Sequence, residues 1–561
     1  MTTTGAIAAT FCSTLVDEWV RAGVRHAIVA PGSRSTPLAL AVMREPKMSV
    51  QVFHDERSAG FAGLGIGLST GVPAVVLCSS GTAGAHFYAA VIEAHLSGVP
   101  LIVCTADRPP HLRDIGAPQT IDQTKMFGDA VRWFHDPGVP SELTRDSWRA
   151  LASRVFVSTL GSRPGPVHLN LPFDEPLFGE PVALPKAREH QWSSRLRGSS
   201  WAMSDIQEFA QVCAGKSGVF IAGKGTPESL LPLAEQLGWP VCADPRSGLR
   251  REHENVIVAF DPILRAGRFV ADVVPEVIVC VGEPPASKVL SQWMRQSHAV
   301  ILHLGTSETV IDPLHLVAKS FVGNLDELCE RAVKEVPTRK ADWLVRWRQA
   351  DDAASSVIET WVAQHWSEIA VAHTASRAMG AGTHCVVSSS MPIRDLEWFG
   401  GVMDGVSVHA NRGANGIDGV VSTAVGVALG SGATTFLLIG DIACIHDSNG
   451  LWDLGKRNAD LRIVLTNNDG GAIFSFLPQA QQVENDVFET IYGTPHGVSF
   501  ASLADAHGIK YCAVFSVEEL ETACRQLGPI LIEAQFDRSV DVAQHEQLNA
   551  AVVAAVDASM A

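Results

Sequence analysis

The stretch Thr435-Phe-Leu-Leu-Ile-Gly-Asp441, followed by Leu461-Arg-Ile-Val-Leu-Thr-Asn467-Asn468-Asp469-Gly470-Gly471, decides the fold. Each half contains a short apolar run, which is typical of a strand covered on both faces of its sheet. We expect residues 449–457 between them to form a helix, which gives a strand–helix–strand unit with parallel strands. Asp441 and Asn468 then lie at the carboxyl edge, where open α/β sheets bind ligands.

A carboxylate and a carboxamide at that edge favour a magnesium site. Mg²⁺ takes few protein ligands and completes its octahedron with water and phosphate oxygens. Taken alone, Gly440-Asp441 or the loop at 467–471 is an ordinary turn sequence. Because both occur together, each at a strand end, the sequence predicts a metal site for a diphosphate-bearing cofactor.

The composition is that of a chain with a substantial hydrophobic core. With 561 residues it exceeds one domain, and 46% hydrophobic and 18% charged residues exclude a disordered chain. The net charge of −17 argues against a nucleic-acid or anionic membrane partner, and no apolar run reaches membrane-span length. The N-terminus lacks the basic region of a secretory signal. Eleven singly scattered cysteines predict reduced thiols and a cytoplasmic location.

Apolar runs alternate with helical patterns along the chain. Representative runs are residues 25–30, 219–222 and 385–388. The alternation predicts an α/β fold with three doubly wound parallel-sheet domains, which we place at residues 1–185, 204–345 and 368–561. The polar stretch 186–203 is interpreted as a linker, and the charged, Trp-rich stretch 335–366 as connecting helices.

Four arginines follow predicted strands in this acidic chain. Arg34 lies in Ala-Pro-Gly-Ser-Arg-Ser-Thr-Pro, Arg108 in Thr-Ala-Asp-Arg-Pro-Pro, Arg394 in Ser-Ser-Ser-Met-Pro-Ile-Arg, and Arg412 in Asn-Arg-Gly-Ala-Asn-Gly-Ile-Asp-Gly. One such arginine is usually a surface or salt-bridge residue. Four of them at strand ends indicate substrates with several carboxylates, because guanidinium binds carboxylate bidentately.

The two strand-end motifs resemble the signature of the thiamine-diphosphate (ThDP) enzymes, which is Gly-Asp-Gly and then Asn-Asn. Ile442 stands where that signature has its second glycine. The resemblance implies ThDP and Mg²⁺ as cofactors, with Mn²⁺ as a substitute, and makes Asp441, Asn468 and the Gly470 carbonyl the metal ligands. It also implies that the three domains are the pyrimidine-binding, central and diphosphate-binding domains of that family.

The same family needs a glutamate that hydrogen-bonds N1′ of the cofactor's aminopyrimidine and favours its imino form. Glu56, in His54-Asp55-Glu56-Arg57 directly after the predicted strand 50–53, is the candidate catalytic residue. Without the metal motif, a helix N-terminal carboxylate stabilised by the helix dipole would be the simpler interpretation. With that motif, the catalytic role is favoured.

The arginine motifs, together with Asp-Glu-Arg and Asn-Asn-Asp-Gly-Gly-Ala-Ile-Phe, are similar to those of the menaquinone-pathway synthases of this family. That resemblance implies a transferase that decarboxylates 2-oxoglutarate and adds the succinyl fragment to isochorismate. The substrate residues it implies are Ser33, Arg34, Arg108, Gln119, Lys288, Ser390, Arg394 and Arg412. A surface lysine is an equally good interpretation of Lys288, and Pro118 stands where the family has asparagine.

A second set of residues would surround ThDP. Ile417 would be the apolar wedge that bends the cofactor, and Ile473 and Phe474 would wall its thiazolium side. The whole set implied by the resemblance is Glu56, Ser388, Ser390, Asn415, Gly416, Ile417, Asp441, Ile442, Ala443, Asn468, Ile473 and Phe474.

Other functions remain as alternatives. An acetolactate-synthase-like ThDP decarboxylase or carboligase would act on smaller keto acids, and acetolactate synthases also carry FAD. A non-catalytic ThDP-binding regulator would be expected to lack Glu56 or Asp441, and both are present. A dinucleotide-binding dehydrogenase would need a GxGxxG motif after a strand. The family builds its active site across a subunit interface, which implies a homodimer or a dimer of dimers.

Overall fold

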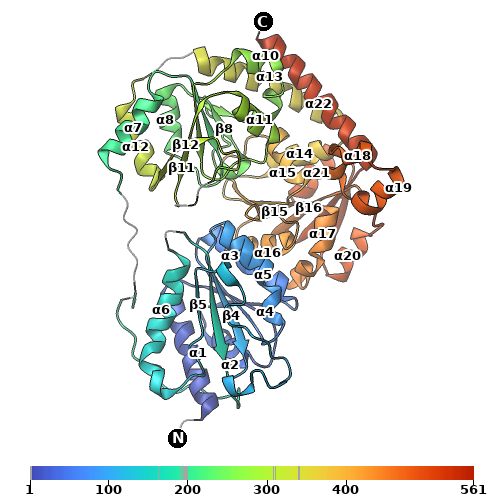
Figure 1. Cartoon of the computed structure of the whole chain (residues 1–561). Helices are drawn as coiled ribbons and strands as arrows, with labels where there is room; N and C mark the ends of the chain where they lie inside the picture. The colour runs from blue at the N-terminus through green and yellow to red at the C-terminus, as the bar shows by residue number, and fades with distance from the viewer. Residues whose placement is uncertain are drawn as a thin grey trace. The chain divides into compact units, whose positions relative to one another are not determined.

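The computed structural model describes residues 3–161, 163–190, 192–193, 200–307, 309, 311–338 and 342–560 (Figure 1). The strands form three six-stranded sheets, and every pairing recorded between two of these strands is parallel. This confirms the predicted α/β class with three parallel sheets. The interpretation of 186–203 as a linker lies partly outside the described residues. The domain limits 1–185, 204–345 and 368–561 remain predictions, although each sheet's strands fall within one of these ranges.

The first sheet has the strand order β2-β1-β3-β4-β6-β5. Helices α1, α2 and α6 bury large side chains such as Trp19 and Trp148 against one face, and α3 and α5 lie on the other. The strands are β1 (His26–Val29), β2 (Ser49–Val52), β3 (Ala74–Cys78), β4 (Leu101–Asp107), β5 (Trp133–His135) and β6 (Pro166–Pro172). The helices are α1 (Thr4–Arg21), α2 (Thr36–Arg44), α3 (Glu56–Thr70), α4 (Ala83–His86), α5 (Tyr88–Leu96) and α6 (Trp148–Thr159).

The second sheet has the order β12-β11-β10-β7-β8-β9, which is the doubly wound order of dinucleotide-binding folds. Its strands are β7 (Gly218–Ala222), β8 (Val241–Ala243), β9 (Val256–Ile257), β10 (Val277–Val281), β11 (Val300–Gly305) and β12 (Val317–Val322). Its helices include α7 (Met203–Cys213), α8 (Leu230–Leu237), α9 (Phe260–Ile263), α10 (Gly267–Asp272), α11 (Lys288–Gln296) and α12 (Leu325–Glu335).

The chain itself closes the switch point of this second sheet, where β7 and β10 end side by side. Lys224 and Glu283 form an isolated bridge there and an ion pair of 3.0 Å. A Cβ on Gly223 would lie 1.5 Å from the Glu283 carbonyl oxygen. These contacts join the ends of β7 and β10 at the switch point.

The third sheet, β14-β13-β15-β16-β18-β17, repeats the strand order of the first. Its strands are β13 (His384–Val387), β14 (Ser407–His409), β15 (Thr435–Gly440), β16 (Leu461–Asn467), β17 (Lys510–Val514) and β18 (Ile530–Gln535). The long helices of this part are α13 (Asp342–Gln364), α14 (Glu368–Ala378), α15 (Met391–Phe399), α16 (Val420–Ser431) and α22 (Arg538–Ser559). Shorter ones are α17 (Asp441–His446), α18 (Gln479–Gln482), α19 (Asn485–Phe488), α20 (Phe500–Ala506) and α21 (Val517–Cys524).

The predicted helix at residues 449–457 is wrong. Helix α17 begins at Asp441, directly after β15, and two short 3₁₀ turns, Ser448–Leu451 and Leu454–Lys456, follow it. Gly450, Asp453 and Gly455 are poor helix formers, and Asp453 has a left-handed backbone with φ 58°. The connection between β15 and β16 is nevertheless a crossover, and the two strands are neighbours in the sheet.

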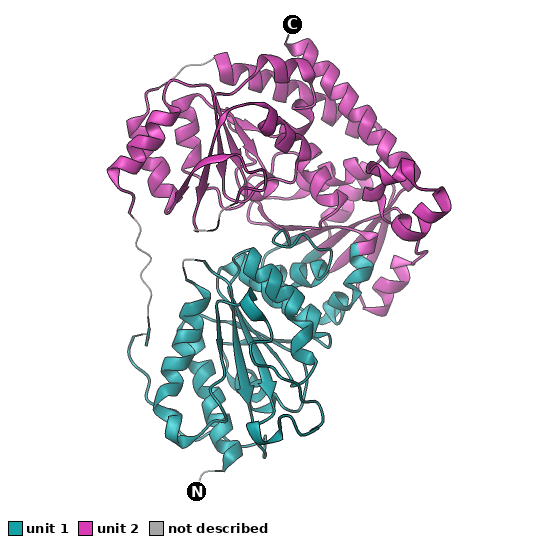
Figure 2. Ribbon diagram, in the orientation of Figure 1, with its two compact units in different colours: residues 1–197, 411–435, 443–461 teal, residues 198–410, 436–442, 462–561 magenta. Residues whose placement is uncertain are grey.

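The chain divides into two compact units (Figure 2). Unit 1 comprises Met1–Arg197, Asn411–Thr435 and Ala443–Leu461, and unit 2 comprises Gly198–Ala410, Phe436–Ile442 and Arg462–Ala561. The first sheet lies in unit 1, together with helix α16. Among the described residues, no helix is both long and apolar enough to cross a membrane.

Candidate cofactor and substrate site

Asp441 and Asn468 meet at the carboxyl edge of the third sheet, in unit 2. The backbone N–H groups of Asn468 and Gly470 each donate to Asp441 Oδ2 at 3.0 Å. The Ile442 N–H donates to Asp441 Oδ1 at 2.6 Å. Both side chains are nearly buried, with exposures of 2% and 8%. The two residues that the sequence pairs are thus in direct contact.

Several polar atoms of unit 2 are buried and lack a hydrogen-bond partner within the described residues. Among them are Asn468 Oδ1 and the hydroxyls of Ser388 and Ser389. The two serines follow β13, which neighbours β15, and the Ser388 N–H donates to the Leu438 carbonyl at 2.9 Å. A buried polar atom without a partner costs about 1–3 kcal/mol. Oxygen atoms left open beside a carboxylate fit Mg²⁺ and a diphosphate.

Gly470, the third predicted metal ligand, has a backbone that only glycine accommodates. Its φ is 150°, and a Cβ there would lie 2.1 Å from the Gly493 carbonyl oxygen. The adjacent 470–471 loop is held to residue 493 by a 2.8 Å hydrogen bond from the Gly471 N–H. Ile442, by contrast, is the second residue of α17 and lies outside the positive-φ region. The side chain at this position is therefore compatible with the fold although the family signature has glycine.

Two residues that contact the predicted metal ligands Asp441 and Asn468 could not be identified from the sequence. Glu368 accepts a 2.7 Å hydrogen bond from Asn468 Nδ2, and His496 Nε2 lies 3.3 Å from Asp441 Oδ2. The His496 Nδ1 accepts the Val498 N–H at 3.0 Å, so Nε2 carries the proton of the neutral ring. Neither residue is in a recognisable motif, because each reaches the site from a remote segment.

Glu56 is the first residue of α3 in unit 1. Asp55 caps that helix: its Oδ1 accepts the N–H groups of Arg57 at 2.8 Å and Ser58 at 3.4 Å. Asp55 Oδ2 accepts Asn449 Nδ2 at 2.7 Å, which fixes the turn before the glutamate. The Glu56 side chain is half-buried, and within the described residues it makes no hydrogen bond or ion pair. Its carboxylate is therefore available to a ligand.

The loops after β1 and β3 pack against each other at the switch point of the first sheet. Ser33 is exposed, whereas Arg34 is buried with 4% exposure. The Arg34 guanidinium donates to the Phe173 carbonyl at 3.0 Å and forms a 3.2 Å ion pair with the exposed Glu175. Phe173 and Glu175, which follow β6, thus hold the Arg34 guanidinium in place.

Gln119 joins the loop after β3 to the segment after β4. Its Nε2 donates to the Ser80 carbonyl at 3.0 Å and the Ser79 hydroxyl at 3.3 Å, and its backbone has a left-handed φ of 54°. Arg108 Nη2 donates to the Pro118 carbonyl at 3.1 Å. The backbone of Pro118 therefore supplies an acceptor at the position where the family has an asparagine side chain.

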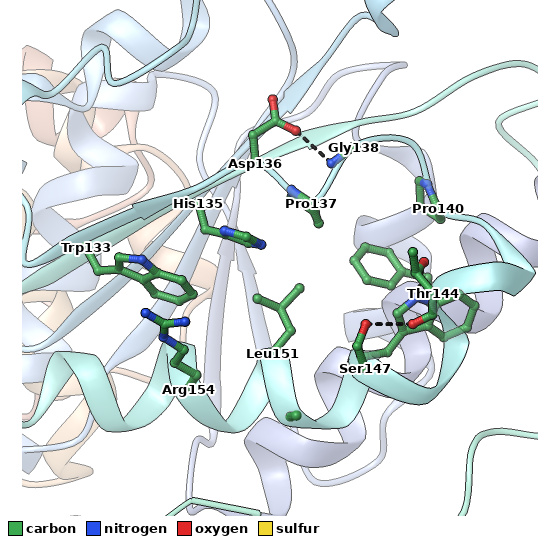
Figure 3. Close-up of a pocket in the computed structure, with 13 residues that line it drawn as sticks. Trp133, His135, Asp136, Pro137, Gly138, Pro140, Thr144, Ser147, Leu151 and Arg154 are labelled. Atoms are coloured by element: carbon green, nitrogen blue, oxygen red, sulfur yellow. Dashed lines mark hydrogen bonds between the residues drawn. The ribbon is translucent and has the colours of Figure 1, made fainter.

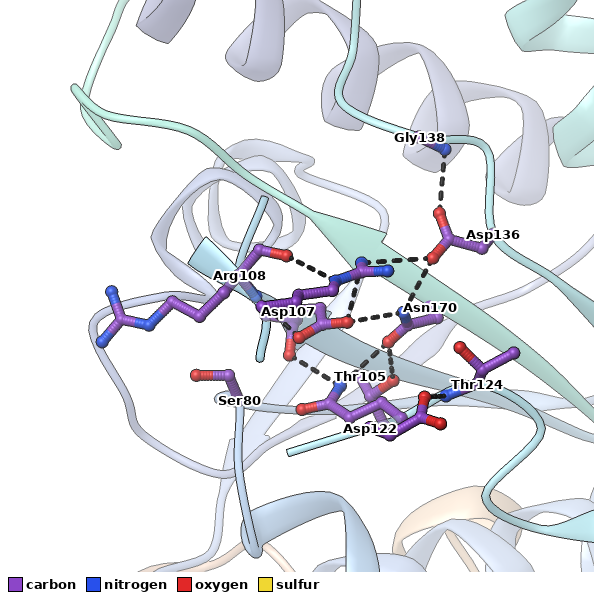
Figure 4. A network of polar contacts seen from close by, with 12 residues as sticks. Ser80, Thr105, Asp107, Arg108, Asp122, Thr124, Asp136, Gly138 and Asn170 are labelled. Carbon is purple, nitrogen blue, oxygen red and sulfur yellow. Dashed lines mark hydrogen bonds and ion pairs between the residues drawn. The ribbon is translucent and has the colours of Figure 1, made fainter. Parts of the chain in front are cut away.

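A polar network behind these residues fixes the segment 108–123 (Figure 4). Gln123, with 1% exposure, accepts the Gly81 N–H at 2.9 Å and donates to the Ala106 carbonyl and to Asn170 Oδ1. Asn170 in turn donates to Asp107 and Asp136. Arg113 bridges the same two carboxylates at 2.8 and 3.3 Å, and its Nε donates to the Arg108 carbonyl. Sequence reasoning missed this network.

The remaining predicted residues divide between the two units. In unit 2, Ser390 precedes α15 with φ 75°, and its carbonyl accepts Arg394 Nη1 at 2.5 Å. Burial lowers the pKa of the half-buried Arg394 guanidinium. Lys288 is exposed at the first residue of α11, and Ile473 and Phe474 lie in the 3₁₀ turn Ala472–Phe476. In unit 1, Arg412, Asn415, Gly416 and Ile417 precede α16, and Ala443 lies in α17.

Glu93 holds the segment before α16. Its Oε1 accepts the Gly413 N–H at 2.8 Å and its Oε2 accepts the Ala414 N–H at 2.7 Å. Asp447 binds the first turn of α16, where its Oδ2 accepts the Ser422 N–H at 2.7 Å. Its Oδ1 accepts the hydroxyls of Ser422 and of Ser58 in α3. Burial raises the pKa of Asp447 to about 6.

A cavity of about 350 Å³ lies elsewhere in unit 1 (Figure 3). It opens between β5, the 3₁₀ turn at Glu142–Ser147 and α6, with Trp133, His135 and Arg154 among its lining residues. None of the residues predicted for the site is among the described residues that line it. This cavity is therefore separate from the predicted site residues.

The fold and the site define the chain as a thiamine pyrophosphate enzyme. Three family models match it: the N-terminal TPP binding domain over residues 10–126, the middle domain over 186–384 and the C-terminal TPP binding domain over 405–534. A structure from Mycobacterium smegmatis described as thiamin diphosphate-dependent has a TM-score of 0.68 at 19% identity, covering 94% of this chain and 99% of the other. Benzoylformate decarboxylase of Polynucleobacter necessarius gives 0.71 at 17%, with coverage of 94% and 98%. At these identities the likeness concerns the fold.

Sequence relatives place the chain more narrowly. It is 40% identical to the 2-succinyl-5-enolpyruvyl-6-hydroxy-3-cyclohexene-1-carboxylate synthase of Chloroflexus aurantiacus, covering 94% of this chain and 93% of the relative. The synthase of Thermobifida fusca is 39% identical, with coverage of 97% and 98%, and that of Listeria monocytogenes 36%, with 98% of both. The chain belongs to the family of these synthases, which confirms the resemblance drawn from its motifs.

Proposed function

We propose that this chain catalyses the ThDP- and Mg²⁺-dependent decarboxylation of 2-oxoglutarate and joins the succinyl fragment to isochorismate in menaquinone biosynthesis. The carboxylate next to the keto group leaves as CO₂, the keto carbon bonds to the ring alkene, and the ring takes up one proton. The product is 2-succinyl-5-enolpyruvyl-6-hydroxy-3-cyclohexene-1-carboxylate. The observation that carries the proposal is the Asp441–Asn468 contact at the sheet edge, in a chain that matches such synthases over nearly its whole length.

The metal ligands in this proposal are Asp441, Asn468 and the Gly470 carbonyl, with Mn²⁺ as an acceptable substitute for Mg²⁺. Support comes from the unpartnered, buried Asn468 Oδ1 and from the two N–H groups that orient Asp441. Three oxygen ligands leave the rest of an octahedron to diphosphate and water. The other residues proposed for the cofactor are Ser388, Ser390, Asn415, Gly416, Ile417, Ile442 and Ala443.

Glu56 holds the proton at N1′ of the aminopyrimidine in this proposal. Its half-buried carboxylate, without another partner in the described residues, supports that role. Bound ThDP supplies the electron sink for the decarboxylation. Ile417 on one side, and Ile473 and Phe474 on another, would exclude water from the reacting carbon.

The arginines bind and orient the carboxylates of the two substrates. Each charge-assisted hydrogen bond contributes about 1.5–3 kcal/mol, so several of them account for selection of multiply charged substrates. Arg34, Arg108, Arg394 and Arg412 carry the charge, and Ser33, Gln119, Lys288 and Ser390 add hydrogen bonds. The tethering of Arg34 by Phe173 and of Arg108 by Pro118 supports a preorganised site.

A turnover assay tests the proposal. Purified protein is supplied with 2-oxoglutarate and isochorismate, with and without ThDP and MgCl₂, and CO₂ and the product are quantified. We expect turnover only when both cofactors are present, and a fall of about 10²–10⁴-fold in Glu56→Gln. Glu142→Gln, which changes an exposed carboxylate at a 3₁₀ turn of the same unit, is the matched control. Cofactor-independent turnover, turnover of pyruvate alone, or a normal rate in Glu56→Gln would refute it.

We further propose a homodimer or a dimer of dimers in which Glu56 and Asp441 of different chains serve one active site. Mixing refolded Glu56→Gln and Asp441→Asn chains tests this arrangement. Each mixed dimer would then contain one site with both native residues, so activity should recover to about a quarter of the wild-type value. No recovery in a sample whose mixed dimers are demonstrated would contradict it.

We also propose a cytoplasmic location and the three domains predicted from the sequence. Nine of the eleven cysteines are buried and the other two are half-buried, as expected for reduced thiols in a cytoplasmic protein. The limits 1–185, 204–345 and 368–561 could be tested by limited proteolysis, with cleavage expected first in the segments between them.

A further inference from the structure

The Asn468 side chain is held by a hydrogen bond to the Glu368 side chain. Asn468 Nδ2 donates to Glu368 Oε1 at 2.7 Å, and both residues are buried. Asn468 Oδ1, the other end of the same amide, is buried and has no hydrogen-bond partner in the described residues. One end of the amide is therefore fixed by a carboxylate, and the other is left open.

Glu368 itself is anchored by the start of a helix. It is the first residue of α14, whose N-cap Ser367 accepts the Ala370 N–H through its hydroxyl at 3.2 Å. A carboxylate in the first turn is favoured by the helix dipole. Its 3% exposure prevents water from taking the place of Asn468 as its partner.

A carboxamide needs such an anchor if it is to bind a cation. Its oxygen and nitrogen ends are similar in shape, so a rotation of 180° exchanges an acceptor for a donor. In the rotated state the Asn468 oxygen would face the Glu368 carboxylate, and the NH₂ group would face the cation. The NH₂ group would then repel the cation, and the 2.7 Å hydrogen bond from Asn468 Nδ2 to Glu368 Oε1 would be lost, so an acceptor oxygen at Glu368 favours the orientation in which Oδ1 faces the metal position.

Behind Glu368 lies a buried group of acids around one histidine. His545 Nε2 is 2.8 Å from Asp395 Oδ1, and His545 Nδ1 is 3.2 Å from Asp541 Oδ1. All three are at most 3% exposed in their side chains, and His545 also contacts the ring of Phe476, with centroids 5.0 Å apart. Asp395 on α15 and Asp541 on α22 are close enough to act electrostatically on Glu368, and all of these groups are buried.

We propose that Glu368 is a positioning residue of the metal site, which fixes the Asn468 amide so that its oxygen is presented to Mg²⁺. This inference rests on the proposed role of Asn468 as a metal ligand. Partners behind a metal ligand commonly change metal affinity by about 10–100-fold when they are lost. Glu368 accordingly acts on Mg²⁺ affinity and, through it, on ThDP retention.

The first test compares Mg²⁺ affinities of full-length variants. Protein stripped with EDTA and saturated with ThDP is titrated with MgCl₂, and binding is followed by calorimetry and by the metal-dependent shift in melting temperature. We expect Glu368→Leu to weaken Mg²⁺ binding about 10–100-fold, and Glu368→Gln, whose amide can present either its oxygen or its NH₂ group to Asn468, to weaken it less than the leucine variant does. Ser367→Ala, which weakens the same helix start and leaves the Asn468 contact in place, should melt earlier but bind Mg²⁺ normally.

The second test is a double-mutant cycle that does not depend on the leucine variant. Asn468→Asp places a carboxylate against Glu368 and should bind Mg²⁺ poorly, because the two carboxylates repel each other or share a proton. Adding Glu368→Gln supplies an N–H donor to the new aspartate, so the double variant should bind Mg²⁺ at least about tenfold more tightly than Asn468→Asp alone. A role for Glu368 in stability alone predicts no such recovery.

The two tests separate this inference from the function on which it rests. Asn468→Ala with unchanged Mg²⁺ affinity would overturn the metal assignment itself. If Asn468→Ala loses Mg²⁺, then unchanged affinity in a folded Glu368→Leu protein, or no coupling in the cycle, overturns the positioning role. If Glu368→Leu does not fold, the cycle alone decides.

Discussion

Gln123→Met should disconnect the segment 108–123 from the sheet beneath it. Methionine is similar in length to glutamine but cannot hydrogen-bond as glutamine does. It would leave the buried Gly81 N–H without its acceptor and remove the bonds to the Ala106 carbonyl and Asn170. A buried unpaired N–H costs about 1–3 kcal/mol, and each lost neutral bond about 0.5–1.5 kcal/mol. The expected destabilisation is therefore about 2–6 kcal/mol, confined at first to unit 1.

The functional effect follows from what that segment carries. Gln119 and Arg108 are both predicted substrate residues, and each is oriented by a bond to this part of the chain. Losing one well-placed charge-assisted contact costs about 1.5–3 kcal/mol, which corresponds to roughly a 10–100-fold loss of kcat/KM. We expect the loss mainly as a raised KM for one or both substrates, because Gln123 does not touch the reacting atoms.

Steady-state kinetics with each substrate varied in turn, combined with thermal melting, checks this reasoning. The matched control is Gln236→Met, which removes a single bond to the Val336 carbonyl in unit 2 and should lower the melting temperature with unchanged KM values. If Gln123→Met keeps both KM values within about twofold of wild type while remaining folded, the segment does not depend on this network and the reasoning is refuted.

Three further outcomes follow from single contacts. The pKa of Asp447 is raised by burial to about 6, so its neutral form favours folding; that contribution is complete below the unfolded pKa of 3.8 and is lost as the pH rises through about 6. Asp447→Asn should therefore gain in melting temperature relative to wild type as the pH is raised from 4 to 7, and a pH-independent difference would contradict this. Gly470→Ala forces a Cβ to 2.1 Å from a carbonyl oxygen and should weaken Mg²⁺ binding at least about tenfold in a calorimetric titration; normal affinity would show that the loop can shift freely. Arg149 pairs with Asp17 at 2.6 Å and Glu18 at 2.8 Å, so Arg149→Met should destabilise unit 1 by about 3–5 kcal/mol, read as an early melting transition with no such change in Arg21→Met.

Much of the fold could be predicted from local sequence patterns. The predicted run 219–222 lies within β7, and the apolar runs in 435–441 and 461–467 form neighbouring strands as expected. Continuous apolar runs of this length can be satisfied only by burial on both faces, so they determine a parallel sheet with helices on each side. The prediction of a helix at 449–457 was wrong because Gly450, Asp453 and Gly455 interrupt the helical pattern. In addition, two side chains of this segment form hydrogen bonds with other parts of the chain. Asn449 donates to Asp55, and Arg457 to Gln51 and the Val52 carbonyl.

The candidate site was only partly predictable, because some of its residues come from segments that are remote in the sequence. Asp441 and Asn468 could be paired from the sequence, because each ends a strand and adjacent parallel strands end together. Glu368 could not, because it reaches Asn468 from a helix a hundred residues earlier in the chain. The sequence also does not show how Pro118 replaces the asparagine of the family. In the structure, the Pro118 backbone carbonyl accepts a hydrogen bond from Arg108.

The sequence by itself therefore determined the strands, the chemistry at their ends and the family of the chain, since these depend on residues close together in the chain. Only the tertiary structure decided which remote groups orient that chemistry: Glu368 behind Asn468, and Gln123 and Asn170 behind Arg108 and Gln119. Such pairs leave no periodic pattern, because a buried polar group needs a partner in space and any distant segment can supply it.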